Sequence, residues 1–139
     1  MNPVEVEKGV AGYLRGLTAL PANVQVHEAV TAQDVDLEKR AIVAQASNLE
    51  FRSPTCFVAT VEVSIRTPAQ IFSQSDHSDL VDVVAKALVN NSSFTTAFNT
   101  SVSKVDMIGA APPNFQAPTF ADRAWLNVIT VDIGVVDAP

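Results

Sequence analysis

The chain has 139 residues, of which 47% are hydrophobic and 17% are charged, and its 15 acidic and 9 basic residues give a formal net charge of −6. The length favours one domain over residues 1–139, and the composition is that of a chain that buries a core, not of a disordered one. The acidic balance argues against a protein that coats nucleic acid, because affinity for phosphates comes from Lys and Arg.

The scarce residue types exclude several kinds of site. Cys56 is the only cysteine, so an internal disulfide and a zinc site built from several cysteines are excluded. The two histidines, His27 and His77, leave little material for a metal centre. No run of about 18 apolar residues predicts a membrane span, and the acidic start lacks the basic residues of a secretory signal. We therefore expect a protein made in a reducing cytosol, with no membrane partner.

The first predicted element is a helix that begins after Asn2. Asn is a favourable N-cap, Pro3 fits the first helical position, and Glu5 lies where a capping box places its acidic residue. Apolar residues then recur at spacings of three and four, which predicts one buried stripe. The stripe consists of Val6, Val10, Tyr13, Leu14 and Leu17. Pro21 ends any continuation of this helix.

Two short strands are predicted next, over residues 23–27 and 41–46. The intervening residues 31–40 are polar and charged, which is typical of a solvated connection. Residues 48–54 are predicted to form a turn.

The clearest strand covers residues 56–66, where apolar and polar residues alternate over a full strand length. One face carries Phe57, Ala59, Val61, Val63 and Ile65. Pro68 ends the strand, because proline has no N–H to donate to a sheet.

A second helix is predicted to follow, with Ser75 or Asp76 as its N-cap. Its apolar stripe consists of His77, Leu80, Val81, Val84, Ala85 and Leu88. Residues 90–93 end it. Phe94 and Phe98 lie four residues apart in a Thr/Ser-rich stretch, which predicts one short helical turn.

The rest of the chain predicts a strand over 102–108, a proline-containing loop over 109–121 and a last strand over 125–136. One face of the last strand carries Asn127, Ile129, Val131, Ile133 and Val135. Each long strand therefore has one mainly apolar face. We expect an α+β fold in which an antiparallel or mixed sheet of four to five strands has both helices packed on one face.

The sequence contains no recognisable catalytic motif. Cys56 with a histidine would make a nucleophile and base, but a lone cysteine at the start of a strand is usually a small buried hydrophobe. Residues 76–79 are a dense polar cluster whose simplest interpretation is a capped helix start. The five glycines are scattered and form no phosphate loop. We expect a protein that is not an enzyme, with no cofactor and no metal.

The order of elements resembles the tail terminator proteins of long-tailed bacteriophages. The resemblance lies in the alternating strand 57–65, its exit 66–70, the polar cap 75–79, the helix 80–88 and the closing strand 126–133. It covers nearly the whole chain in order and length.

The resemblance implies a structural virion protein, located in the tail or neck, that forms a homohexameric ring on the tail tube. Such a ring stops tube polymerisation and joins the tail to the head-side connector protein. In contractile tails it also meets the sheath, and DNA passes through its lumen without specific binding. A net negative chain suits that passage, because like charges discourage sticking.

Two long segments are the candidates for docking, because loops too long for tight hairpins are often functional. One is the mixed-charge segment 34–40, and the other is the proline-containing loop 109–121. The candidate contact residues are Asp34, Asp36, Glu38, Lys39, Arg40, Pro112, Pro113 and Phe115.

Three alternatives stay open at this point. A head-closure or neck protein of the same virion would have a similar size and fold. An enzyme of unrecognised type would be favoured by a pocket that holds Cys56 and a histidine within hydrogen-bond reach. A small ligand-binding domain would require a deep apolar pocket within the monomer.

Overall fold

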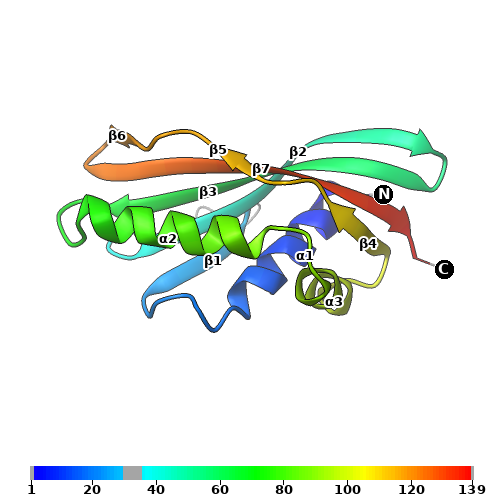
Figure 1. The fold of residues 1–139 in the computed structure, drawn as a ribbon, viewed down its shortest axis with the longest axis horizontal. Coiled ribbons are helices and arrows are strands. Elements are labelled where there is room, and N and C mark those ends of the chain that lie inside the picture. The colour runs from blue at the N-terminus through cyan, green and yellow to red at the C-terminus, as the bar shows by residue number, and fades with distance from the viewer. Residues whose placement is uncertain (1, 30–35, 139) are drawn as a thin grey trace.

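The computed structural model describes residues 2–29 and 36–138 (Figure 1). These residues form an α+β fold in which three helices pack on one face of a mixed sheet of seven strands, so the predicted class is confirmed and the sheet is larger than expected. The helices are α1 (Pro3–Arg15), α2 (Gln74–Ala87) and α3 (Ser92–Ser101). The strands are β1 (Val24–Glu28), β2 (Arg40–Ser53), β3 (Cys56–Pro68), β4 (Val105–Ala110), β5 (Asn114–Phe115), β6 (Thr119–Ala121) and β7 (Ala124–Asp137).

The sheet has the strand order β1-β2-β3-β7-β4, and β5 and β6 also pair with β7. Strands β4, β5 and β6 follow one another along the same edge of β7, so together they act as one interrupted edge strand. Strand β1 is parallel to β2, and every other pairing is antiparallel.

The alternation predicted for the two long strands is confirmed. The inward side chains of β3 and β7 are buried under the helices, and the other side chains of these strands lie on the opposite face of the sheet. The buried set on these two strands includes Phe57, Ala59, Val61, Val63, Ile65, Ile129, Val131, Ile133 and Val135. The core therefore lies between one sheet face and the apolar stripes of α1, α2 and α3.

The turn predicted over residues 48–54 is wrong. Strand β2 continues to Ser53, and the connection to β3 is only Pro54 and Thr55. A bulge between Ala46 and Asn48 shifts the register of β2 against β3. The shift interrupts the alternation of apolar and polar residues by which a strand is predicted from sequence. The result is a hairpin of two long strands in place of a short strand and a loop.

The loop predicted over residues 109–121 is also wrong in part. Strand β4 extends to Ala110, and β5 and β6 pair with β7 farther along. Prolines fragment this segment, because each removes a donor from the ladder. Asp122 and Arg123 then form the two-residue β6–β7 turn, with φ values of 51° and 59°.

The helix caps agree with the sequence for α1 but not for α2. The Asn2 side chain accepts a hydrogen bond from the backbone N–H of Val4, as expected of an N-cap. The cap of α2 is Ser73, not Ser75 or Asp76, and Asp76 closes a capping box with it. The apolar stripe of α2 is nevertheless as predicted.

Helix α3 is longer than the single turn that the two phenylalanines predicted. Asn91 caps it, and it has 10 residues. Phe94 and Phe98 are buried, and the ring of Phe94 stacks on that of Tyr13 with a centroid distance of 4.5 Å. Phe98 lies directly over Gly9, where a side chain on α1 would collide with its ring. The pair α1–α3 is therefore a close helix–helix contact that depends on a glycine.

Candidate functional site

Among the described residues, no helix covers the second face of the sheet. Its side chains include Val58, Thr60, Glu62, Ser64 and Arg66 of β3 and Leu126, Val128, Thr130, Asp132 and Val136 of β7. Val128, the fifth residue of β7, is 46% exposed there. We call this surface the open face. A broad surface of mixed polarity with apolar side chains is typical of a contact surface.

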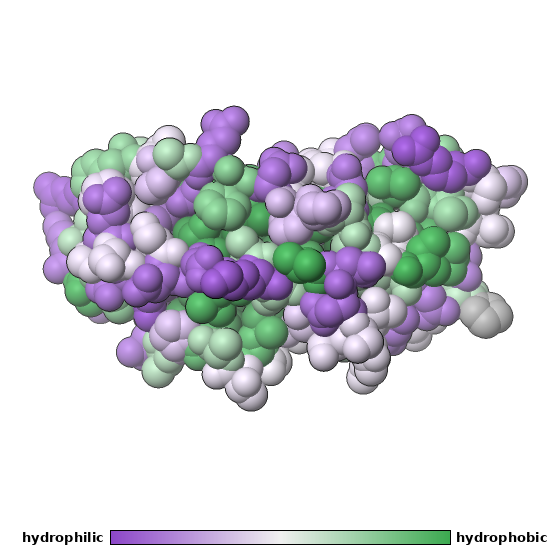
Figure 2. Space-filling model, viewed as in Figure 1, coloured by the Kyte–Doolittle hydropathy of each residue, from purple (hydrophilic) through white to green (hydrophobic). Residues whose placement is uncertain are grey.

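Large hydrophobic side chains reach the surface elsewhere too. Figure 2 shows hydrophobic patches on both sides of a hydrophilic band that crosses the molecule in this view. The large exposed hydrophobics are Leu37, Phe51, Ile71, Val89, Ile108, Phe115, Phe120 and Val128. Single exposed apolar residues are ordinary, but those that gather on one surface favour a partner.

The β2–β3 hairpin extends past the helices, at the right of Figure 1. Phe51 near its tip is 66% exposed, and its ring meets the buried Phe57 edge-on at a centroid distance of 4.5 Å. Arg52 and Glu50 form a 3.2 Å ion pair in which both side chains are exposed. Such a pair contributes little to stability. The tip of the hairpin therefore exposes the aromatic ring of Phe51, which packs on a buried neighbour.

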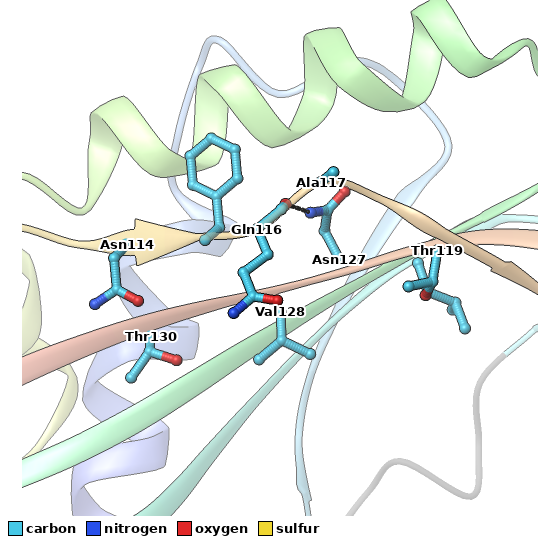
Figure 3. A pocket seen from close by; sticks show the side chains of 9 residues that line it. Asn114, Gln116, Ala117, Thr119, Asn127, Val128 and Thr130 are labelled. Carbon is cyan, nitrogen blue, oxygen red and sulfur yellow. Dashed lines mark hydrogen bonds between the residues drawn. The ribbon is translucent and has the colours of Figure 1, made fainter.

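A groove of about 400 Å³ lies where the edge strand is interrupted between β5 and β6 (Figure 3). Asn114, Gln116, Val128 and Thr130 approach one another across it. The backbone carbonyl of Gln116 accepts a 2.7 Å hydrogen bond from the side-chain nitrogen of Asn127. The groove is therefore lined by amides and hydroxyls around an apolar floor, with Phe115 at its margin.

A buried hydrogen-bond chain supports this groove from the helix side. The Asn127 side-chain nitrogen donates its hydrogen bond to Gln116. The side-chain oxygen of Asn127 therefore faces His77, and it accepts a 2.8 Å hydrogen bond from His77 Nε2. His77 Nδ1 then accepts from the hydroxyl of Thr67 at 2.7 Å. All three side chains are buried. The neutral histidine with its proton on Nε2 satisfies every partner, and it ties α2 to β3 and β7.

The electrostatics of the 76–79 cluster match a capped helix start. Burial lowers the pKa of His77 below its ordinary value of 6.5, and the hydrogen bond to Asn127 opposes that shift. The backbone N–H and then the hydroxyl of Ser73 hold the pKa of Asp76 below 3.8. Asp76 is thus an ionised cap, and His77 is a neutral core residue.

The stability of the protein is expected to fall as the pH falls below 6.5. The unfolded chain takes up a proton on His77 near pH 6.5. The folded chain takes up that proton only at a lower pH, because burial lowers the pKa of His77. The free energy of unfolding therefore decreases across this window, as protonation favours the unfolded state.

Urea denaturation at a series of pH values measures this effect. The variant His77→Gln should show a flatter profile over the same window, because it lacks the titrating group. A wild-type stability that does not change as the pH drops through 6.5 would contradict the assignment.

The predicted contact residues of the charged segment have different environments. Asp34 lies outside the described residues. Asp36 is held to β1, because its backbone N–H and C=O both bond to the side chain of Gln25, at 3.0 and 2.7 Å. Glu38 and Lys39 are exposed. Asp36, Glu38 and Lys39 are therefore accessible at the surface.

Arg40 does not belong to a solvated loop, so that expectation is wrong. It begins β2 and is only 7% exposed, and its guanidinium carbon lies 4.5 Å from the ring centroid of Phe72. Its Nε is buried without a hydrogen-bond partner. A planar guanidinium tolerates such burial when it stacks on an aromatic face. Its charge also helps to lower the pKa of Asp76.

The candidate residues of the proline-containing loop lie at the interrupted edge. Pro112 is exposed, Pro113 is half-buried, and Phe115 in β5 is 48% exposed. Phe115 borders the groove of Figure 3, whereas Glu38 lines a different groove near the β6–β7 turn. The two predicted segments thus border different grooves.

Of the large exposed hydrophobics, the sequence analysis named only Phe115 as a contact candidate, and Phe51, Ile71 and Ile108 are among those that it missed. An aromatic residue in a segment predicted to be a turn was a usable signal for Phe51, because turns favour small and polar residues. Ile108 lies beside a bulge, which no simple alternation identifies.

The residues considered for catalysis or metal binding lie in separate elements. Cys56 is half-buried at the start of β3. His27 in β1 forms a 2.9 Å hydrogen bond with Gln25. His77 belongs to the buried hydrogen-bond network with Thr67 and Asn127. Within residues 2–29 and 36–138, no group of three or more His, Cys, Asp or Glu side chains is placed to hold a metal ion. No helix in this part of the chain is long and apolar enough to span a membrane.

No family model matches the chain, and no curated protein is significantly similar in sequence.

Proposed function

We propose that the protein is a tail terminator: a structural subunit of a homohexameric ring that caps a phage tail tube, stops its polymerisation and joins the tail to the head-side connector. The main support is the open face, a broad sheet surface with no helix over it in the described chain and with Val128 exposed on it. A protein that acts through shape-matched contacts needs such a surface more than it needs a reacting group.

The interrupted edge of the sheet supports the capping part of the proposal. An exposed, regular edge strand invites pairing with another chain, and proteins blunt such edges with prolines and short strands. Here Pro112, Pro113 and Pro118 break the edge into three pieces. A subunit that must end a polymer benefits from an edge that cannot extend a sheet.

The proposal also names the proteins that the ring contacts and its location in the virion. The ring would contact the tube protein on one side and the connector on the other, with the sheath as a further neighbour in a contractile tail. DNA would pass through the lumen without specific binding, in keeping with the net charge of −6. The protein would act in the virion and require no cofactor or catalytic residue.

Deleting the gene from the phage that carries it is expected to give tails of uncontrolled length. Electron microscopy of the resulting particles measures tail length, and supplying the chain in trans is the control. Tails of normal length that fail to join heads would instead indicate the head-closure or neck protein, and normal infectious virions would contradict both functions.

A further inference from the structure

The groove between β5 and β6 is a hollow in the open face of the sheet. Asn114 lies opposite Thr130 in the β5–β7 pairing, and Thr119 lies opposite Leu126 in the β6–β7 pairing. Side chains of directly opposite residues point to the same side of a sheet, and Thr130 and Leu126 belong to the open face. The groove of about 400 Å³ therefore lies beside the exposed Val128, on a surface that no described helix covers.

None of the nine residues that line this groove carries a charge. On the neighbouring strand β3, Glu62 lies opposite Thr130 and Arg66 lies opposite Leu126, so one acidic and one basic side chain stand outside the lining. Opposite signs at the two ends favour neither a cation nor an anion. The groove therefore suits a neutral ligand.

The polar side chains of the groove have unused hydrogen-bonding capacity. Within the described chain, four of the lining side chains neither donate nor accept a hydrogen bond. They are those of Asn114, Gln116, Thr119 and Thr130. An amide and a hydroxyl can each both donate and accept. Such a set matches a ligand group that also does both, as a carboxamide does and a carboxylate or an ammonium group does not.

The main chain of β7 adds a donor and an acceptor at the same place. The carbonyl of Asp132 accepts a 2.8 Å hydrogen bond from the N–H of Ala111, so the backbone groups of Asp132 point to the interrupted edge. Because this direction alternates along a strand, the backbone groups of Val128 point to the same edge. Neither β5 nor β6 supplies a strand partner for Val128. One ladder position of β7 therefore faces the interruption.

Buried groups fix the shape of the groove. Asn127 is 6% exposed, and its hydrogen bond to the carbonyl of Gln116 holds the segment 116–118 against β7. His77 holds Asn127 in turn, and Pro118 restricts the backbone of the same segment. A site that is positioned in advance binds its ligand with a smaller loss of conformational entropy.

The floor of the groove distinguishes a side-chain amide from a sugar. Leu126 and Val128 provide an aliphatic floor, on which the methylene groups of a glutamine can lie while its carboxamide reaches the polar rim. Phe115 is the aromatic residue of the lining, but it lies opposite the buried Ile129 and so on the helix side of the sheet. A sugar ring would therefore find no aromatic face to pack on.

We propose that this groove binds a carboxamide side chain, that of a glutamine or an asparagine, presented by an extended segment of another protein. A free amino acid would bring an ammonium and a carboxylate group, for which the lining has no charged partner. The site goes beyond the proposed function, because it assigns a specific contact to one part of the open face.

Nuclear magnetic resonance titration of the isotope-labelled chain with blocked tripeptides tests the site. The probe acetyl-Ala-Gln-Ala-amide should cause saturable shifts in the side-chain amide signals of Asn114 and Gln116 and in the backbone amide signal of Val128. Acetyl-Ala-Met-Ala-amide has a side chain of similar length without the carboxamide. It should bind about tenfold or more weakly, because it leaves polar groups of the groove unpaired.

Two variants of the chain test the same contact from the other side. Asn114→Leu removes one amide from an exposed position of the groove and should weaken binding of the glutamine peptide about fivefold or more. Asn48→Leu, the same change at an exposed position of β2 outside the groove, is the matched control and should leave binding unchanged. Circular dichroism confirms that both variants are folded.

Three results would overturn the inference: no shift with the glutamine peptide, equal binding of the glutamine and methionine peptides, or tighter binding of methyl glucoside or free glutamine than of the glutamine peptide. The titration uses the purified chain alone, so its failure would leave the capping function standing. Tails of normal length after gene deletion would contradict capping and leave the groove as a binding site.

Discussion

Replacing Val61 with Asp is expected to abolish folding. Val61 is fully buried at the middle of β3, opposite Val131 in β7, in the face that the helices cover. An aspartate there would have to bury a carboxylate with no partner, or stay neutral without hydrogen bonds. Either cost is several kcal/mol, a large part of the about 5–15 kcal/mol that stabilises a typical domain.

The matched control is Ser64→Asp, which places the same charge on the same strand but on the open face, where Ser64 is exposed. Circular dichroism and thermal melting measure both variants. The control should fold and melt close to the wild type, whereas Val61→Asp should have no cooperative transition. A soluble Val61→Asp protein with a normal melting temperature would mean that the two faces of the sheet are assigned in reverse.

Replacing Phe98 with Ala is expected to reduce the free energy of unfolding by about 3–5 kcal/mol, the usual cost of truncating a buried aromatic side chain. The Phe98 ring is fully buried and fills the contact between α3 and α1, where Gly9 leaves room for it. Its removal leaves a cavity that two helices held at a fixed distance cannot easily close.

Urea denaturation measures this cost. Thr96→Ala, at an exposed position of the same helix, is the control for effects on helix propensity and should change stability by less than about 0.5 kcal/mol. A Phe98→Ala protein as stable as that control would show that α3 does not pack on α1 as described.

The parts of the fold that could be predicted are those in which a regular spacing of buried apolar residues continues over a whole helix or strand. The alternation through β3 and β7 assigns the buried and open faces residue by residue, and the stripe of α2 includes the buried His77. Hydrophobic burial alone determines these features, so the sequence shows them directly.

The parts that could not be predicted depend on long-range pairing. The second half of β2 follows a bulge after Ala46, and its residues pair only because β3 lies beside them. Strands β5 and β6 are two and three residues long and form on the edge that β7 supplies. Neither segment has a periodic signal of its own, so tertiary context decides its structure.

The candidate site was predictable only in outline. Phe115 and Glu38 each line a groove, and their role in docking stays a prediction. Arg40 is buried instead, because a stacked guanidinium can lie in a core that charge alone would exclude. The pairing of Asp106 with β7, which brings it to the open face beside Val136, depends on a register that no local pattern encodes.

The most direct test of the proposed tail-terminator function is electron cryo-microscopy of phage particles assembled in cells that express this chain. We expect six copies in a ring at the head-proximal end of the tube, with DNA passing through its centre. A location elsewhere in the particle, or a protein that never enters a particle at all, would contradict the account.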